Sequence, residues 1–235
     1  MNVETVMQEL EAIGKERMKK LYISNGAHEP VFGVATGEMK PIAKKIRKNQ
    51  ALAEELYATG NYDAMYFAGV IAEPQAMTEA DFERWIDQAY FYMLSDFVVA
   101  VTLSETDIAQ EVSDKWIASG DDLRMSAGWS CYCWLLGSRP DTEFAESKLA
   151  EMLDKVKDAI HDAPLRTKSS MNNFLYTVAV SFKPLHEKAV EAAREVGPVE
   201  FKKDNAKSKL LNASDMIQKA IDRGGIGFKR KYVRC

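Results

Sequence analysis

Cysteine and histidine are scarce in this 235-residue chain, which has three of each. Cys131 and Cys133 lie two residues apart, a spacing that turns them to different faces of a helix, and Cys235 stands far from both. We therefore expect reduced thiols, and neither a disulfide framework nor a zinc site. The histidines are widely separated and form no HExxH pattern, so no catalytic metal is expected.

Long apolar runs and nucleotide-binding motifs are also missing. No stretch approaches the roughly 18 apolar residues of a membrane span, and residues 1–20 are charged every few positions instead of carrying the apolar core of a signal peptide. The glycines of residues 223–227 lack the GK[ST] ending of a phosphate-binding loop, and no motif supports a serine or cysteine nucleophile. These absences predict a cytoplasmic protein without a membrane segment, a cofactor or a metal.

The net charge is small, at −4, but it hides a strong separation of charge along the chain. Residues 1–50 carry 9 basic and 6 acidic side chains, residues 51–165 carry 7 and 22, and residues 166–235 carry 15 and 7. Basic ends around an acidic middle indicate a surface for a polyanion, because lysines and arginines that neutralise phosphates supply most of the non-specific affinity for nucleic acids. The alternative is that these charges are solvated helix faces.

Apolar residues recur with the period of an α-helix throughout the chain. Val3, Val6, Leu10 and Ile13 follow one another at steps of three or four, and residues 145–160 repeat the pattern. Turn signals near residues 60, 120, 140 and 184 divide the chain into short helices of about 10 to 18 residues. Two segments, 78–81 and 104–107, have the spacing of capping boxes at helix starts.

Four segments share one design, a short polar lead followed by an apolar helix rich in small residues. They cover residues 61–73, 95–105, 121–136 and 168–182, and their starts are spaced irregularly. Such spacing is typical of degenerate two-helix solenoid repeats of the HEAT type. We therefore predict an all-α fold in which residues 1–235 form a single repeat domain with a basic C-terminal segment, residues 223–235.

Residues 18–46, 52–74, 187–201 and 223–235 resemble the DNA alkylation repair family of HEAT-like repeat proteins, a superfamily that contains DNA glycosylases. The sharpest matches are GVATGEMK and GFKRK. The resemblance implies a right-handed α-α superhelix, a solenoid whose concave basic groove cradles duplex DNA. For the glycosylases of the family it also implies the release of N3- or N7-alkylated purines without a metal.

An alkylated purine is already a cationic leaving group, so its excision calls for stabilisation of the developing sugar cation and not for a strong acid. A carboxylate meets this need, and aromatic rings can hold the cationic base. The family signature is an aromatic residue four positions before an aspartate, with a second aromatic residue and an arginine from later repeats. By this resemblance Asp96, Tyr92 and Tyr176 are the catalytic candidates, with Tyr92 and Asp96 on one helix face.

The sequence departs from that signature at three positions. Tyr92 and Tyr176 stand where the family typically has tryptophan, and the family's arginine falls at or beside Ser126. The nearest arginine is Arg124, about 200° around the helix. Other roles stay open: Asp96 as a helix N-cap, the tyrosines as core aromatic residues, and Arg124 as an ion-pair partner of a neighbouring aspartate.

The basic residues of both ends are expected to form one positive rim that contacts DNA phosphates. Phe228 and Tyr232 are expected to anchor the final segment, which glycines allow to bend closely against a neighbour; a solvated, fraying tail is the alternative. The DNA-binding candidates are Lys40, Lys44, Lys45, Lys48, Arg124, Ser126, Lys202, Lys203, Lys207, Lys209, Lys229, Arg230 and Lys231.

Three functions remain. The favoured hypothesis is a monomeric protein that binds double-stranded or branched DNA, alkylated or otherwise distorted, by backbone contacts and shape, without efficient base excision. The first alternative is an active glycosylase for alkylated purines. The second alternative is a scaffold for protein interactions, which a weak salt dependence of binding would distinguish from the other two.

Overall fold

The computed structural model of the chain describes residues 1–202 and 208–233. The prediction of an all-α fold is confirmed, because the regular secondary structure of the described residues is helical apart from one two-stranded sheet. Two compact units, Met1–Ile108 and Ala109–Val233, are each described by themselves, and the single repeat domain stays a prediction. Among the described residues, no helix has both the length and the apolar character required to cross a membrane.

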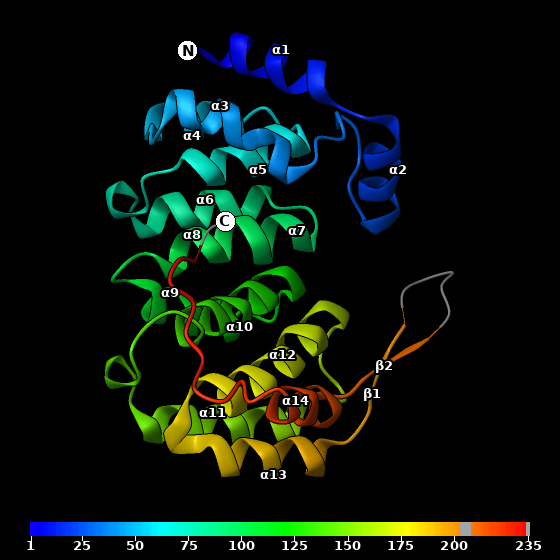
Figure 1. Ribbon diagram of the computed structural model, residues 1–235, viewed down its shortest axis with the longest axis vertical. Coiled ribbons are helices and arrows are strands. Elements are labelled where there is room, and N and C mark those ends of the chain that lie inside the picture. Colours follow the sequence, from blue (N-terminus) through cyan, green and yellow to red (C-terminus); the bar gives the residue numbers. More distant parts are fainter. Residues whose placement is uncertain (203–207, 234–235) are drawn as a thin grey trace. The chain divides into compact units, whose positions relative to one another are not determined.

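The first unit consists of short helices that follow one another with tight connections (Figure 1). In chain order its elements are α1 (Val3–Ile13), α2 (Glu16–Asn25), a 3-10 turn (Thr36–Met39), α3 (Lys40–Ile46), α4 (Gln50–Tyr57), α5 (Tyr62–Ile71), a 3-10 turn (Pro74–Ala76), α6 (Glu79–Gln88), α7 (Tyr92–Leu94), a π turn (Ser95–Val99) and α8 (Ala100–Ser104).

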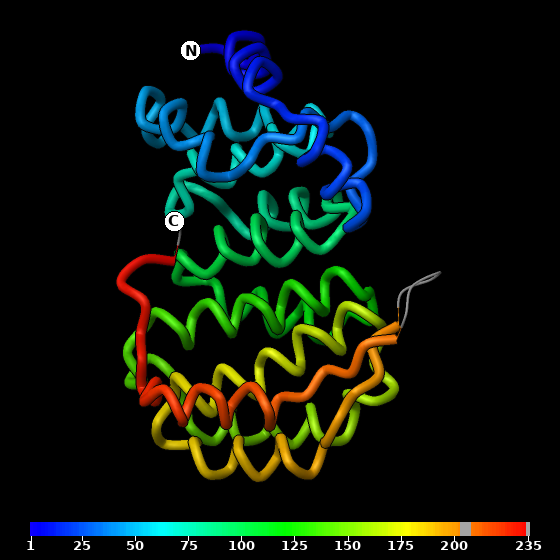
Figure 2. The backbone as a smooth tube through the Cα atoms, turned by 45° about the vertical axis from the view of Figure 1, so that its right-hand side comes forward, coloured from blue at the N-terminus to red at the C-terminus, as the bar shows by residue number. Residues whose placement is uncertain are grey.

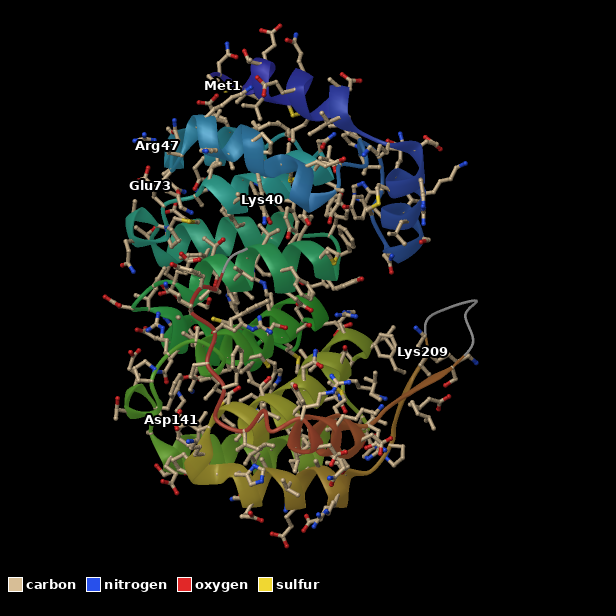
Figure 3. The ribbon with its side chains drawn as sticks, in the orientation of Figure 1. Met1, Lys40, Arg47, Glu73, Asp141 and Lys209 are labelled. Atoms are coloured by element: carbon tan, nitrogen blue, oxygen red, sulfur yellow. The ribbon has the colours of Figure 1, made fainter. Side chains whose placement is uncertain are left out.

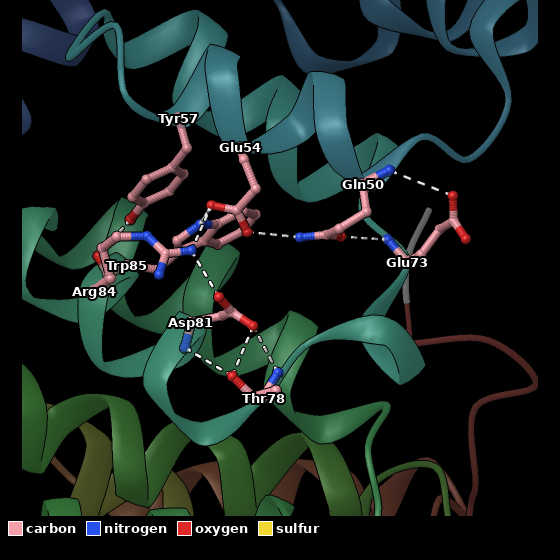
Figure 4. A network of polar contacts seen from close by, with 8 residues as sticks. All are labelled: Gln50, Glu54, Tyr57, Glu73, Thr78, Asp81, Arg84 and Trp85. Atoms are coloured by element: carbon pink, nitrogen blue, oxygen red, sulfur yellow. Dashed lines mark hydrogen bonds and ion pairs between the residues drawn. The ribbon is translucent and has the colours of Figure 1, made fainter.

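Helix α4 is joined to helix α6 by both stacking and polar contacts (Figure 4). The rings of Tyr57 and Trp85 stack with centroids 4.2 Å apart, and the Tyr57 hydroxyl donates to the Trp85 carbonyl. The carboxylate of Glu54 accepts hydrogen bonds from Arg84 at 2.8 Å and from the Trp85 indole at 3.0 Å. These contacts fix successive helical segments of the unit against each other, as a repeat architecture requires.

The loop that carries the GVATGEMK motif is held in place by one buried carboxylate. Asp63 of α5 accepts the backbone N–H groups of Phe32, Gly33 and Val34 at 2.6–3.0 Å. Burial raises the pKa of Asp63 above its ordinary value, although the bonds from Val34, Gly33 and Phe32 lower it. Gly33 has a φ of 83°, and a Cβ added there would lie 2.4 Å from the backbone nitrogen of Lys19, so the loop and α2 meet backbone to backbone.

The second unit has longer helices and ends in an extended segment (Figure 1). Its elements are α9 (Ala109–Ile117), α10 (Asp122–Leu136), a 3-10 turn (Asp141–Glu143), α11 (Glu146–Ala159), α12 (Leu165–Ser181), a 3-10 turn (Lys183–Leu185), α13 (His186–Val196), strand β1 (Val199–Phe201), strand β2 (Lys209–Leu211) and α14 (Ala213–Asp222).

Helices α10 and α12 form the centre of the second unit. Trp129 of α10 packs edge-on against Phe174 of α12 at a centroid distance of 5.0 Å, and both side chains are fully buried. Cys131 is a buried thiol whose pKa burial raises to about 12, Cys133 is a half-buried thiol, and neither forms a disulfide. The expectation of reduced thiols is therefore confirmed for these two residues, and Cys235 lies outside the described residues.

The local predictions have mixed outcomes. The capping box at Thr78 and Asp81 is confirmed. The one at Ser104 is wrong, because Ser104 ends α8 and its hydroxyl donates back to the Val101 carbonyl instead of capping a helix. The short antiparallel pair β1–β2 was not predicted; Figures 1 and 2 show it standing out from the helices of the second unit.

Candidate nucleic-acid interface

The predicted catalytic carboxylate lies in the π turn Ser95–Val99, which follows α7 without a break in the helix. In a π turn the backbone hydrogen bonds run from i+5 to i and not from i+4 to i. The ring of Tyr92 contacts the ring of Phe97, five positions on, at a centroid distance of 6.3 Å. Tyr92 lies before the point at which the helix widens and Asp96 lies after it, and the expectation that they share one helix face stays a prediction.

Asp96 itself is buried, with 3% of its surface exposed. One of its carboxylate oxygens accepts a hydrogen bond from the Ser95 hydroxyl at 2.9 Å. The residues before it already have helical backbone angles, so Asp96 lies inside a helical segment and does not cap one. The N-cap alternative is therefore wrong, and the carboxylate is a buried acceptor beside a half-buried tyrosine.

Tyr176 lies on α12 and is half-buried. It belongs to the second unit, whereas Tyr92 and Asp96 belong to the first, so the three catalytic candidates are not brought together within either unit. Across the described residues no group of three or more histidine, cysteine, aspartate or glutamate side chains is arranged to hold a metal ion.

The start of α10 is tied to the start of α12. The Asp122 carboxylate accepts the backbone N–H groups of Arg166 at 3.0 Å and of Thr167 at 2.8 Å. Ser126 is fully buried, and its hydroxyl donates to the Arg166 carbonyl at 3.5 Å. A phosphate could therefore reach this side chain only after the surrounding residues had moved. Arg124 is half-buried, and its backbone N–H is capped by Asp121.

Arg166 is a basic residue of this region that the sequence analysis missed. Its guanidinium carbon lies 5.9 Å from the centre of the Phe201 ring on β1. Phe201 in turn pairs across the sheet with Lys209 on β2. Arg166 therefore lies over an aromatic ring of the strand pair, at a position opposite Lys209. The sequence signal was the basic stretch at residues 166–168, directly after Pro164 at the helix start.

The four lysines predicted in the first unit divide into two pairs. Lys45 forms an ion pair with Glu9 at 3.2 Å, and Lys48 donates to the Val70 carbonyl at 3.0 Å. Lys40 and Lys44 are exposed on α3 and form no ion pair with an acidic residue of the described chain. Figure 3 labels Lys40. Lys40 and Lys44 are therefore the cations of this group that are open to a phosphate.

In the second unit, Lys202 and Lys209 are exposed at the ends of the two strands, and Lys209 is labelled in Figure 3. Both lysines lie at the ends of the two-stranded pair β1–β2, so few other residues surround their side chains. The two remaining candidates of this group, Lys203 and Lys207, lie outside the described residues.

The C-terminal segment is docked on the second unit, and the prediction that it is not a free end is confirmed for residues 227–230. Lys229 donates to the Leu136 carbonyl at 2.7 Å and forms an ion pair with Asp141 at 2.7 Å. The backbone N–H of Arg230 donates to the Gly137 carbonyl, and its guanidinium lies 4.9 Å from the Trp134 ring centre.

The predicted anchors of this segment were wrong. Phe228 and Tyr232 point to solvent, with 64% and 69% of their surfaces exposed. Anchoring comes instead from the basic side chains, because the last carbonyls of α10 have no intrahelical donor and attract cations. Lys231 is exposed and forms no ion pair with an acidic residue of the described chain.

Comparison with known proteins agrees with this architecture. The sequence profile of the family described as DNA alkylation repair enzyme matches residues 6–207. An uncharacterised protein of Listeria innocua is 31% identical over 221 residues, covering 92% of this chain and 95% of the relative. An uncharacterised protein of Listeria monocytogenes is 30% identical over 220 residues with the same coverage.

A solved structure matches over the full length of both chains, with 76% sequence identity and a TM-score of 0.97. That protein is described as one of a new family related to the HEAT-like repeat DNA glycosylases, with affinity for branched DNA structures. The HEAT-like fold predicted from the repeats is therefore confirmed. The chain belongs to the DNA alkylation repair enzyme family.

Proposed function

We propose that this protein binds DNA whose path is damaged, bent or branched, that it does so mainly through phosphate contacts, and that it does not excise bases efficiently. The observation that carries the proposal is the 76% identity over the full length to a protein with affinity for branched DNA structures.

The exposed cations support the DNA-binding part of the proposal. Lys40 and Lys44 in the first unit, and Lys202, Lys209 and Lys231 in the second, hold their charges in water where a phosphate can reach them. Phosphate contacts position a protein on DNA without reading its sequence, so recognition would follow the shape of the backbone. We further propose that the protein acts as a monomer and that alkylated DNA is one of the distorted forms that it binds.

The burial of Asp96 supports the absence of efficient excision. A carboxylate stabilises a sugar cation only from close by, and Asp96 offers 3% of its surface and already accepts a bond from Ser95. One observation favours the alternative of an active glycosylase: Asp96 lies in a π turn, a distortion that is frequent at functional sites, beside the half-buried ring of Tyr92.

One set of DNAs tests both functions. Linear duplex, alkylated duplex and four-way junction are compared by gel shift over a range of salt concentrations, and each is assayed for released base. We expect binding that weakens steeply with salt, tighter binding of the junction, and no release above background. Release of an alkylpurine that is lost in Asp96→Asn would establish the glycosylase instead, whereas binding that is insensitive to salt would contradict the phosphate contacts and favour a protein scaffold.

A further inference from the structure

The C-terminal strap, residues 227–232, is fixed to the second unit at several points. The Gly227 N–H donates to the Val180 carbonyl at the end of α12, at 2.6 Å. Gly227 has a φ of 79°, and a Cβ there would lie 2.1 Å from the Lys183 side chain, so the strap passes close to the protein. Lys229 and Arg230 then bind the end of α10. Figures 1 and 2 show the strap, in red, after α14.

This docking leaves two aromatic rings in water. Phe228 and Tyr232 are the most exposed aromatic side chains of the described residues, at 64% and 69%. Burial of such a ring is favourable, yet the strap buries most of the Lys229 side chain and leaves both rings exposed. Rings displayed on a segment that is otherwise held in place are suited to contact with another molecule.

The charges around the rings indicate what that molecule is. Residues 223–233 carry four basic side chains and no acidic one. Lys229 is neutralised by Asp141, but Arg230 and Lys231 form no ion pair within the part of the chain that the structure describes. Exposed aromatic rings interleaved with cations that have no acidic partner are the features with which proteins bind single-stranded nucleic acids, through base stacking and phosphate contacts.

We propose that the strap binds unpaired nucleotides of DNA, with bases stacked on Phe228 and Tyr232 and phosphates contacted by Arg230 and Lys231. The proposal rests on the proposed DNA-binding function and refines it. In a continuous duplex each base face is covered by its neighbours, so these rings can stack only where base stacking is interrupted. Unpaired nucleotides at a branch point or a flap provide such open faces.

The test compares native protein with the double variant Phe228→Ala, Tyr232→Ala. The probes are a dT oligonucleotide, a four-way junction with unpaired dT residues at its centre, the same junction fully paired, and a linear duplex. Because stacking is worth about 1 kcal/mol or more for each base and the double variant removes two rings, we expect it to bind the two probes with unpaired dT at least about thirtyfold more weakly. Its affinity for the linear duplex should change less than about twofold.

Two further variants control for surface changes as such. Ile221→Ala removes another exposed apolar side chain of the second unit, from α14, and should leave all four affinities unchanged. Phe228→Trp with Tyr232→Trp keeps the stacking surface and should bind unpaired dT at least as well as the native protein. Equal affinity of the native protein and the alanine variant for both probes with unpaired dT would overturn the proposal. The exposed rings would then be interpreted as a contact surface for a protein partner.

The outcomes also separate this proposal from the function on which it rests. If the native protein binds none of the four DNAs, the proposed function itself is wrong. If it binds the junctions and the duplex but not the dT oligonucleotide, DNA binding stands and the strap proposal is overturned.

Discussion

The three adjacent cations Lys229, Arg230 and Lys231 are alike in sequence but not in structure, and this difference predicts how each one affects DNA binding. Lys231 is exposed and has no acidic partner in the described chain. Each phosphate contact contributes about 0.9 to the slope of log affinity against log salt. We therefore expect Lys231→Ala to flatten that slope by about 0.9. Between 50 and 200 mM salt, native affinity should then fall about 3.5-fold more than the affinity of the variant.

Lys229→Ala should behave differently, because the charge of Lys229 is already used inside the protein. Its ammonium group bonds the Leu136 carbonyl and pairs with Asp141, and both side chains are less than a third exposed. Removing it leaves a helix-end carbonyl and a carboxylate without their donor. We expect a loss of about 1–2 kcal/mol in unfolding free energy, and a salt slope within about 0.3 of the native value.

Fluorescence anisotropy with a labelled four-way junction measures the slopes, and urea unfolding measures stability. Lys155→Ala is a matched control, since Lys155 is an exposed lysine on α11 in the acidic part of the chain and should change neither quantity. The reasoning is refuted if Lys229→Ala flattens the slope while Lys231→Ala leaves it unchanged.

Two further predictions concern the loop that carries GVATGEMK. Gly33→Ala should lower the unfolding free energy by about 3 kcal/mol or more, because the new side chain would have a positive φ and a Cβ 2.4 Å from the Lys19 backbone nitrogen. Gly37→Ala is the control, since nothing lies within 4 Å of a Cβ at that position. Equal urea midpoints for the two variants would contradict this reasoning. Burial raises the pKa of Asp63, so its stabilising contribution is fully present below the ordinary value of 3.8 and is lost as the pH rises through the higher folded value. The difference in unfolding free energy between native protein and Asp63→Asn should therefore shrink as the pH rises above 3.8, and a difference that grows over that interval would count against this account.

The helices and their repeat pattern could be predicted from the sequence because period, caps and turn residues act locally. Asn61 and Asp121 show this well: each opens one of the segments with a polar lead, and each caps a helix, α5 and α10. The π turn could not be predicted in the same way. The π turn packs closely against helix α5 at Gly69. A Cβ on Gly69 would lie 2.7 Å from the Val98 side chain, so this packing requires glycine at that position. The spacing of apolar residues along the sequence does not reveal a contact of this kind between two helices.

The C-terminal strap shows the same limit. Its basic and aromatic residues suggested a docked segment, which is correct, but the choice of anchors depended on groups distant in sequence. Lys229 reaches a carbonyl 93 positions earlier, and only the fold reveals that this carbonyl ends α10. The short sheet escaped prediction because its strands have three residues each, too few for an alternating pattern to be recognised.

Base excision and DNA binding both require side chains that face the DNA, and the described residues meet these two requirements unequally. A carboxylate that stabilises a sugar cation has to be accessible to the sugar, whereas only 3% of the surface of Asp96 is exposed. The cations suited to phosphates, among them Lys40, Lys209 and Lys231, remain in water. Phosphate contacts follow the path of the backbone and carry no information on a single base. A lesion would then matter through the bend or opening that it causes, and a junction, which bends the backbone without chemical damage, would be bound for the same physical reason.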